Sequence, residues 1–213
     1  MQESERKIGA VLLAAGEGSR MGGVPKCLLR LDGEPLIHRH LRAMRDAGVD
    51  QVVVVTGHYH QQIEPVAQSF DVQIARNPNP DDGQPSSVRI GIEALGAGFD
   101  LVFIALADQP LVGTAEFREL IKAFGQRTPG TQIVYPQVNG QRGNPVLFDG
   151  ELIAMMLASG KQVAGRKFID ENPQLVHVHE TGNERFILDL DTREDVDEFE
   201  KRSGKKLALP VMS

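Results

Sequence analysis

The sequence predicts an α/β protein built on a doubly wound, mostly parallel sheet, with a small antiparallel ribbon. Three observations support this expectation. Short apolar runs such as Ile8–Ala14 and Gln51–Thr56 lack polar alternation, which is typical of strands buried on both faces. Segments with helical spacing of apolar residues separate these runs. Strands that alternate with helices favour parallel pairing through right-handed crossovers.

The first half of the chain alternates regularly. Ile8–Ala14 is the expected first strand, and a glycine-rich loop leads from it to a helix over Pro35–Ala47, which Gly48 ends. The elements expected next are a strand at Gln51–Thr56, a helix through Tyr59–Ser69, a strand at Val72–Ala75, a helix from Ser86 to Leu95 and a strand at Asp100–Leu106. Ligands of such sheets bind beyond the carboxyl ends of the strands, so residues that follow strands are the first candidates for a site.

The second half is less regular. After a helix at Thr114–Phe124, Gly and Pro punctuate the chain, and the segment NGQRGNPVLF at 139–148 resembles an appended antiparallel ribbon. The other elements expected here are a strand at Gln132–Pro136, helices at Leu152–Ala158 and Val163–Asp170, strands at Leu175–His179 and Phe186–Leu190, and a last helix after Thr192. We find no internal repeat or linker, so one domain is expected over 1–213.

Composition excludes several classes of function. A net charge of -6 and a pI near 5.5 give no basic surface for nucleic acid. No apolar run approaches membrane-spanning length, and the first residues, MQESERK, do not form a secretory signal. The single cysteine, Cys27, cannot form an internal disulfide. We therefore expect a cytoplasmic protein with no nucleic-acid partner and no membrane partner.

The strongest functional pattern is LAAGEGSRMGGVPK at 13–26, which directly follows the first strand. Its four glycines allow backbone N–H groups to approach phosphate oxygens, and an Arg and a Lys can neutralise a triphosphate. The residues expected to contact the nucleotide here are Leu13, Ala14, Ala15, Gly16, Gly18, Ser19, Arg20 and Lys26. A plain glycine-rich turn is the alternative interpretation, and it accounts for a bare GxG better than for the whole string.

Two familiar phosphate loops do not fit this string. Met21 occupies the position of the third glycine in G-x-G-x-x-G, and no acidic residue ends the second strand, which argues against a dinucleotide site. In the Walker pattern, Lys follows Gly directly, whereas Val24 and Pro25 separate Gly23 from Lys26 here.

The string resembles the pattern L-A-A-G-x-G-S-R-M-G-G-x-x-K of the molybdenum cofactor nucleotidyltransferases, and more broadly of the nucleoside-diphosphate-sugar pyrophosphorylases. The resemblance extends over nearly the whole chain, through TGH at 56–58, DDGQPSSVRIG at 81–91, ADQP at 107–110, RGNPVLF at 142–148 and LDLDTREDV at 188–196. It is closest to the cytidylyltransferases of this family. Ala15 stands where the guanylyl branch usually has Gly, which favours CTP over GTP as the nucleotide.

The resemblance implies Mg²⁺ as the cofactor. Asp108 follows the apolar run LVFIALA, and a carboxylate at the end of a central strand is a suitable ligand for Mg²⁺, although a turn or N-cap aspartate is a common alternative. The family pattern Asp-x-Asp-Thr favours Asp191 as the second ligand. Asp189 remains the other candidate, because alternate residues of the expected strand share a face. Arg20, Lys26 and Asp108 are the expected catalytic residues.

The resemblance also assigns contacts to both substrates. Gly57, Gln84 and Ser87 are expected at the nucleotide, although helix capping alone could explain the serine. Arg142, Gly143 and Asn144 are expected at the acceptor, with a polar hairpin turn as the alternative. Residues 1–112 would thus form the nucleotide-binding half and 113–213 the acceptor-binding half.

The function implied is transfer of a nucleotidyl group, cytidylyl by preference, from a nucleoside triphosphate to the terminal phosphate of molybdenum-molybdopterin. The product would then pass to a molybdoenzyme or its insertion chaperone. Three alternatives stay open: a guanylyltransferase of the same cofactor, a transferase acting on a sugar or alditol phosphate, and a non-enzymatic nucleotide-binding chaperone that would not need Asp108.

Two histidine pairs and Cys27 suggest weaker hypotheses. His58 with His60, and His177 with His179, could each contribute two metal ligands, but no further Cys or His lies nearby to complete a site. Cys27 follows Lys26 and is expected to be a small buried residue rather than a reactive thiol.

Overall fold

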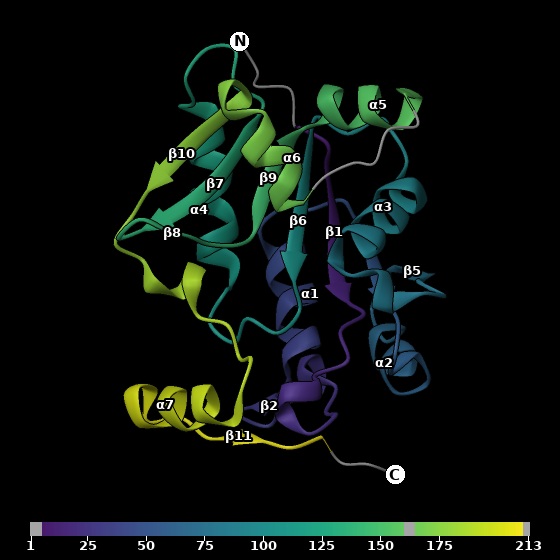
Figure 1. The fold of residues 1–213 in the computed structure, drawn as a ribbon, viewed down its shortest axis with the longest axis vertical. Coiled ribbons are helices and arrows are strands. Elements are labelled where there is room, and N and C mark those ends of the chain that lie inside the picture. Colours follow the sequence, from purple (N-terminus) through teal and green to yellow (C-terminus); the bar gives the residue numbers. More distant parts are fainter. Residues whose placement is uncertain (1–5, 160–164, 211–213) are drawn as a thin grey trace.

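The computed structural model describes residues 6–159 and 165–210. In these residues eight strands form one sheet in the order β10-β7-β9-β6-β1-β4-β5, with β8 paired to β7 (Figure 1). The parallel core consists of β1 (Ile8–Ala14), β4 (Gln51–Thr56), β5 (Gln73–Arg76) and β6 (Leu101–Leu106). The antiparallel strand β9 (Val146–Asp149) joins β6 to β7 (Ile133–Val138), and β10 (Val176–Glu180) runs parallel to β7. The expected mostly parallel α/β sheet is confirmed.

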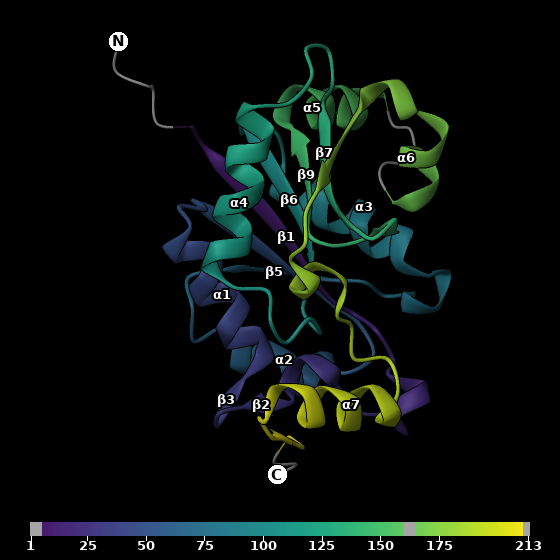
Figure 2. The ribbon, with the colours of Figure 1, turned by 90° about the vertical axis from the view of Figure 1, so that its left-hand side faces the viewer.

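Helices cover both faces of this sheet. The first face carries α1 (Leu36–Asp46), α2 (His60–Ala67) and α4 (Thr114–Gly125), and the second carries α3 (Gln84–Leu95), α5 (Gly150–Ser159) and α6 (Arg166–Glu171). Figure 2 shows α1 and α4 on one side and α3 and α6 on the other. Along β1, Leu12 enters the first core while Val11 and Leu13 enter the second, so the apolar run is buried on both faces. No described helix combines the length and apolarity that a membrane span requires.

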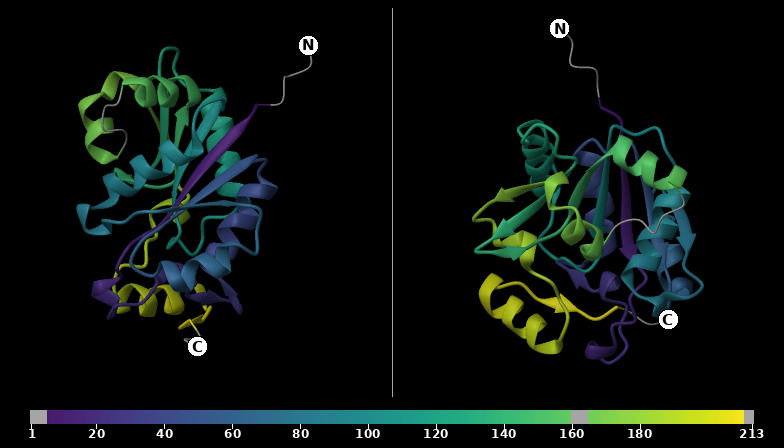
Figure 3. Two further views of the ribbon diagram at one scale, coloured as in Figure 1. Left: turned by 90° about the vertical axis from the view of Figure 1, so that its right-hand side faces the viewer. Right: turned by 45° about the horizontal axis from the view of Figure 1, so that its top comes forward.

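A smaller core lies beyond the carboxyl ends of the central strands. It forms between the loop after β1 and α7 (Arg193–Ser203), where Met21 and Leu29 pack against Leu190 and Phe199. Beside it lies a three-stranded antiparallel sheet in the order β11-β2-β3, made of β2 (Arg30–Leu31), β3 (Glu34–Pro35) and β11 (Leu207–Ala208). Figure 3 shows α7 next to the loop after β1. This core ties the late part of the chain to the loop after β1.

The expected ribbon at 139–148 forms differently. Asn139 and Gly140 both have positive φ and close a hairpin between β7 and β8 (Gln141–Arg142). The rest of the segment becomes β9, which pairs between β6 and β7 within the main sheet instead of in a separate unit. The acceptor-side residues are therefore fixed to the same sheet as the nucleotide loop.

The expected strand at Phe186–Leu190 is wrong. Glu184–Ile187 forms a 3-10 turn, and irregular chain follows as far as α7. The physical reason is that Phe186 is buried in the first core while Leu190 is buried in the small core, so the segment bridges two cores instead of pairing with a strand. The helix expected at Val163–Asp170 begins at Arg166, and its first two residues lie outside the described residues.

Candidate active site

Three parallel strands end together at one edge of the sheet. Ala14 of β1 lies opposite Thr56 of β4, and Leu13 lies opposite Leu106 of β6. The glycine-rich loop, Gly57 and Asp108 follow these three strand ends. The residues expected to handle the nucleotide phosphates are therefore brought to one place by strand register.

The loop after β1 folds back on itself through its glycines. Gly18 has φ 62°, and a Cβ added there would lie 2.3 Å from the Val24 carbonyl oxygen, so this position excludes a side chain. The N–H groups of Met21, Gly22 and Gly23 bond to carbonyls within the loop. These three N–H donors are therefore already paired within the loop.

Two cations of this loop meet two carboxylates. Lys26 Nζ lies 2.5 Å from Asp108 Oδ2 and 2.9 Å from Asp191 Oδ1. Arg20 Nη1 lies 3.3 Å from Asp191 Oδ2. The Lys26 side chain is 15% exposed and the Arg20 side chain 71%, so Lys26 forms the enclosed part of the cluster and Arg20 its solvent-facing part.

The opposite charges of Lys26 and Asp191 each favour the ionised form of the other. Burial alone would lower the pKa of Lys26, but the Asp108 and Asp191 carboxylates outweigh it and hold that pKa above its usual value. The hydrogen bond from Lys26 lowers the pKa of Asp191. Asp189 behaves differently, since burial and the nearby Asp108 charge raise its pKa to about 6. Asp191 and Asp189 thus differ in environment, a distinction that the expected shared strand face did not predict.

The two carboxylates suit a hard cation. Asp108 and Asp191 already approach one cation, the Lys26 ammonium, from two sides. Among the described residues no group of three or more His, Cys, Asp or Glu side chains is arranged to hold a metal ion. Mg²⁺ commonly binds one or two carboxylates and takes its remaining ligands from water and substrate phosphates, so this pair fits Mg²⁺ in the presence of nucleotide.

Gly57, Gln84 and Ser87, the other residues expected at the nucleotide, lie just after β4 and at the start of α3. A Cβ at Gly57 would lie 2.7 Å from the Ala15 carbonyl oxygen and 3.0 Å from the Pro80 Cβ, so the three segments are in close contact there. Gln84 begins α3 and Ser87 lies in its first turn. Ser87 does not cap the helix, and its hydroxyl instead accepts a hydrogen bond from Asn77 Nδ2 at 2.9 Å.

A pocket of about 220 Å³ joins the two expected substrate regions. Its polar lining includes Gln84, Arg142, Asn144 and Asp189, and its apolar lining comes from β6, β9 and two helices of the second face. Arg142 donates to Asp170 at 2.7 Å and stacks over Tyr135, while its Nη1 is buried with no partner among the described residues. A buried unpaired guanidinium donor is costly, which makes this nitrogen available to an acceptor atom of a ligand.

Sequence reasoning missed two residues beside the site. Asn77, 3% exposed, bonds to both Ser86 and Ser87 and fixes the start of α3. Gln109, 1% exposed, lies next to Asp108 and donates to the Phe186 carbonyl. No sequence pattern singled out Asn77, and Gln109 appeared only as a letter of the ADQP string.

The histidine pairs contact neighbouring side chains. His58 lies 3.2 Å from Asp81, and His179 lies 2.8 Å from Glu119. His177 lies 3.3 Å from Thr128. The two histidines of each pair therefore turn to different partners.

Cys27 is buried near the Lys26–Asp108 pair, and burial raises the pKa of its thiol to about 12 from a usual value of 9.0. We expect the native protein to react with a thiol reagent at pH 8 at least ~100-fold more slowly than the protein in denaturant, because the thiolate is the reactive form. The change in pKa also makes folding stability fall as pH rises from about 9 toward 12, since the unfolded thiol ionises first. Stopped-flow labelling with and without urea measures the ratio, and equal rates would contradict the buried position.

Comparisons with known proteins add independent information. A family model described as the MobA-like NTP transferase domain matches residues 10–178. The chain is 29% identical over 196 residues to nicotine blue oxidoreductase of Paenarthrobacter nicotinovorans, covering 89% of this chain and 94% of that protein. It is 31% identical over 170 residues to bifunctional protein GlmU of Acidovorax sp. (strain JS42), covering 76% of this chain. The chain spans 35% of GlmU and 22% of a bifunctional IPC transferase and DIPP synthase of Thermococcus kodakarensis, so it corresponds to a part of these longer proteins.

Solved structures share the fold. A nucleotidyl transferase from Methanothermobacter is 26% identical, with a TM-score of 0.72 over 92% of this chain and 97% of that one. The Rv0371c protein of Mycobacterium tuberculosis, solved in complex with manganese, is 21% identical, with a TM-score of 0.68 over 93% of this chain and 100% of that one. At this lower identity the second likeness concerns the fold alone.

Proposed function

The chain belongs to the MobA-like NTP transferase family, and from this premise we propose that it transfers a cytidylyl group from CTP to the terminal phosphate of molybdenum-molybdopterin. The reaction uses Mg²⁺ and releases pyrophosphate. The observation that carries the proposal is the contact of Lys26 with both Asp108 and Asp191, beside the pocket that Arg142 and Asn144 line.

The proposal explains why the site holds matched charges. Asp108 and Asp191 pair with Arg20 and Lys26, the cations that a triphosphate would need. Nucleotide phosphates would pair with Arg20 and Lys26 in their place, and Asp108 and Asp191 would then be free to hold Mg²⁺. Nucleotide and Mg²⁺ should therefore bind together, and Mg²⁺ alone should bind weakly.

The residues then divide the chemistry. Lys26, enclosed by the cluster, stabilises charge that grows at the α-phosphate, and Arg20 stabilises the leaving pyrophosphate. Asp108 and Asp191 would hold Mg²⁺, which would supply positive charge to neutralise the nucleotide phosphates. The Nη1 of Arg142 positions the acceptor. An ionised acceptor phosphate is itself the nucleophile, so no general base is required.

Release of pyrophosphate tests the proposal directly. We expect it when the protein, CTP, Mg²⁺ and molybdopterin are all present, and not when any one is omitted. Sugar and alditol phosphates are tested as alternative acceptors. If the protein uses one of them instead of molybdopterin, the proposed acceptor is wrong but nucleotidyl transfer stands. Absence of pyrophosphate with every acceptor would favour a non-enzymatic role or an oxidoreductase role of the kind named for the Paenarthrobacter relative.

Nucleotide choice is a separate prediction. Ala15 is 7% exposed, and its carbonyl and Cβ lie against Gly57. We expect the wild type to prefer CTP, and Ala15→Gly to reduce its discrimination against GTP about tenfold, because loss of the methyl group lets the loop shift beneath the base. Competition between CTP and GTP measures this ratio. A wild type that already prefers GTP would replace the cytidylyl assignment with the guanylyl one.

A further inference from the structure

The carbonyl oxygen of Phe186 is a meeting point for three segments of the site. It accepts hydrogen bonds from Gln109 Nε2 at 3.1 Å and from the Asn144 N–H at 2.9 Å. Gly143 lies so close that an added Cβ would be 2.5 Å from this oxygen. The loop after β6, the acceptor-side loop and the segment leading to Asp191 are therefore held together at one atom.

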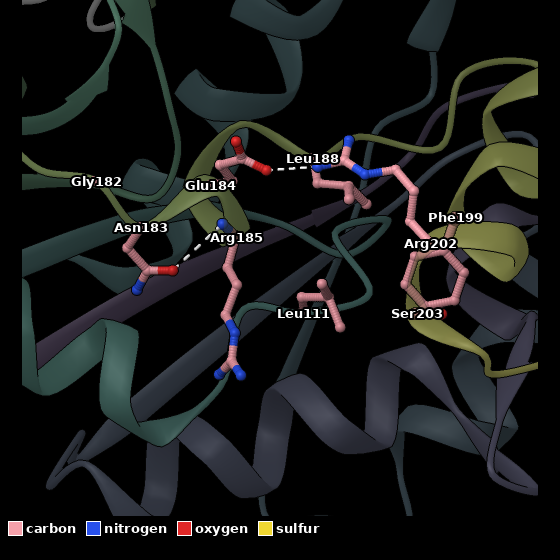
Figure 4. A pocket seen from close by; sticks show the side chains of 9 residues that line it. All are labelled: Leu111, Gly182, Asn183, Glu184, Arg185, Leu188, Phe199, Arg202 and Ser203. Carbon is pink, nitrogen blue, oxygen red and sulfur yellow. Dashed lines mark hydrogen bonds and ion pairs between the residues drawn. The ribbon is translucent and has the colours of Figure 1, made fainter.

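The side chains of Phe186 and Leu190 anchor this last segment in two cores, but the chain around and between them borders open pockets. A pocket of about 400 Å³ separates residues 182–188 from α7, and Figure 4 shows Leu111, Leu188 and Phe199 around it, with Arg202 paired to Glu184 across one side. A second pocket, of about 270 Å³, is lined by Ile187, Leu188 and Asp189. Where side chains face pockets instead of tightly packed neighbours, hydrogen bonds contribute more to fixing the position of the backbone.

Gln109 supplies such a bond from the interior. Its side chain is 1% exposed, and its amide nitrogen Nε2 is the atom that donates to the Phe186 carbonyl. Its Oε1 has no partner among the described residues, so the bond donated by Nε2 orients the amide. Gln109 directly follows Asp108 in the sequence. Its bond to Phe186 therefore links the position of Asp108 to the segment that leads to Asp191.

We propose that Gln109 is a positioning residue, which uses the Phe186 carbonyl to set the Asp108 loop against the acceptor loop and the Asp191 segment. This inference rests on the proposed function. It predicts that loss of the amide misplaces the reacting groups, and misplacement by about 1 Å can cost up to ~100-fold in rate. Nucleotide binding should change less than turnover, because among the described residues Arg20 and Lys26 pair with aspartates and not with Gln109.

The test compares two variants of similar local disruption. Gln109→Met keeps the volume but removes the donor. Asn183→Ala, in the segment that carries Phe186, removes side-chain bonds to the Arg185 N–H and to Glu116 and Glu119 of α4 without removing a bond to the Phe186 carbonyl. For Gln109→Met we expect kcat to fall at least ~10-fold with the nucleotide KM within about twofold. For Asn183→Ala we expect kcat within about twofold of wild type at a comparable loss of thermal stability.

Amide hydrogen exchange gives a second readout that needs no activity. Gln109→Met should speed exchange at the Asn144 N–H, while Asn183→Ala should speed it at the Arg185 N–H. If Gln109→Met does not fold, Gln109→Asn, which withdraws the amide by one methylene, takes its place. Unchanged Asn144 exchange, or equal loss of kcat in the two variants, would overturn the proposal. A wild type without transferase activity would contradict the proposed function, and the exchange experiment would still decide whether Gln109 fixes the acceptor loop.

Discussion

Replacing Lys26 with Ala is expected to lower turnover by about 10²–10³-fold, the usual effect of removing one donor that stabilises charge in a transition state. Lys26 contacts both Asp108 and Asp191 and is the enclosed cation of the cluster. Steady-state kinetics of pyrophosphate release measure the loss. Lys205, which pairs with Asp32 away from the cluster, is the matched control, and Lys205→Ala should keep turnover within about twofold.

The same variant carries a stability prediction. Without Lys26, Asp108 loses this cation and Asp191 keeps only the solvent-facing Arg20, so the melting temperature should fall and Mg²⁺ should restore part of it. Wild-type protein, whose carboxylates are already paired, should respond less to Mg²⁺ alone. Near-wild-type kinetics of Lys26→Ala would remove the assignment of this loop to the triphosphate.

The second large effect is expected for Asp108→Asn, which keeps shape but removes charge. Even groups outside the ligand shell of a metal change affinity or activity by ~10–100-fold, so loss of a ligand should exceed about 100-fold. The Mg²⁺ concentration for half-maximal activity should rise with it. We expect the same of Asp191→Asn and a milder effect of Asp189→Asn, because Asp191 contacts Lys26 whereas Asp189 faces Gln109.

Asp81, whose side chain is 86% exposed beside His58, provides the control, and Asp81→Asn should titrate with Mg²⁺ as the wild type does. If Asp108→Asn and Asp191→Asn behave like this control, the two-carboxylate metal site is wrong. A larger effect at Asp189 than at Asp191 would exchange the two roles and leave the rest of the mechanism standing.

Most of the sheet was predictable because its strands are buried on both faces. The apolar run from Ile8 to Ala14 predicts a buried strand, and the structure places β1 at those residues. The hairpin of β2 and β3 was missed, although Asp32-Gly33 with positive φ at both residues is a turn signal, because two-residue strands carry no periodic pattern. The ribbon was placed outside the sheet because sequence does not show which strand edge remains open for β9.

The candidate site divides in a similar way. Its charged members, Arg20, Lys26, Asp108 and Asp191, were all chosen from the sequence, and the structure brings them together. The Phe186 carbonyl could not have been chosen, since a backbone oxygen has no signature in the sequence and its partner Gln109 lies 77 positions away. The resemblance favoured Asp191 over Asp189, but the different surroundings of the two carboxylates depend on such distant contacts and are visible only in three dimensions.

The small core between Met21 and Phe199 affects how the protein is made. Lys26 and Asp191 are 165 positions apart, and their loops are joined by the last helix of the described chain. During synthesis on the ribosome, the central strands can assemble long before that helix leaves the exit tunnel. The growing chain therefore acquires a folded body well before it acquires a complete charge cluster. Nascent protein should be able to fold without yet consuming nucleotide, and premature termination upstream of Leu190 should yield an inert product instead of a deregulated enzyme.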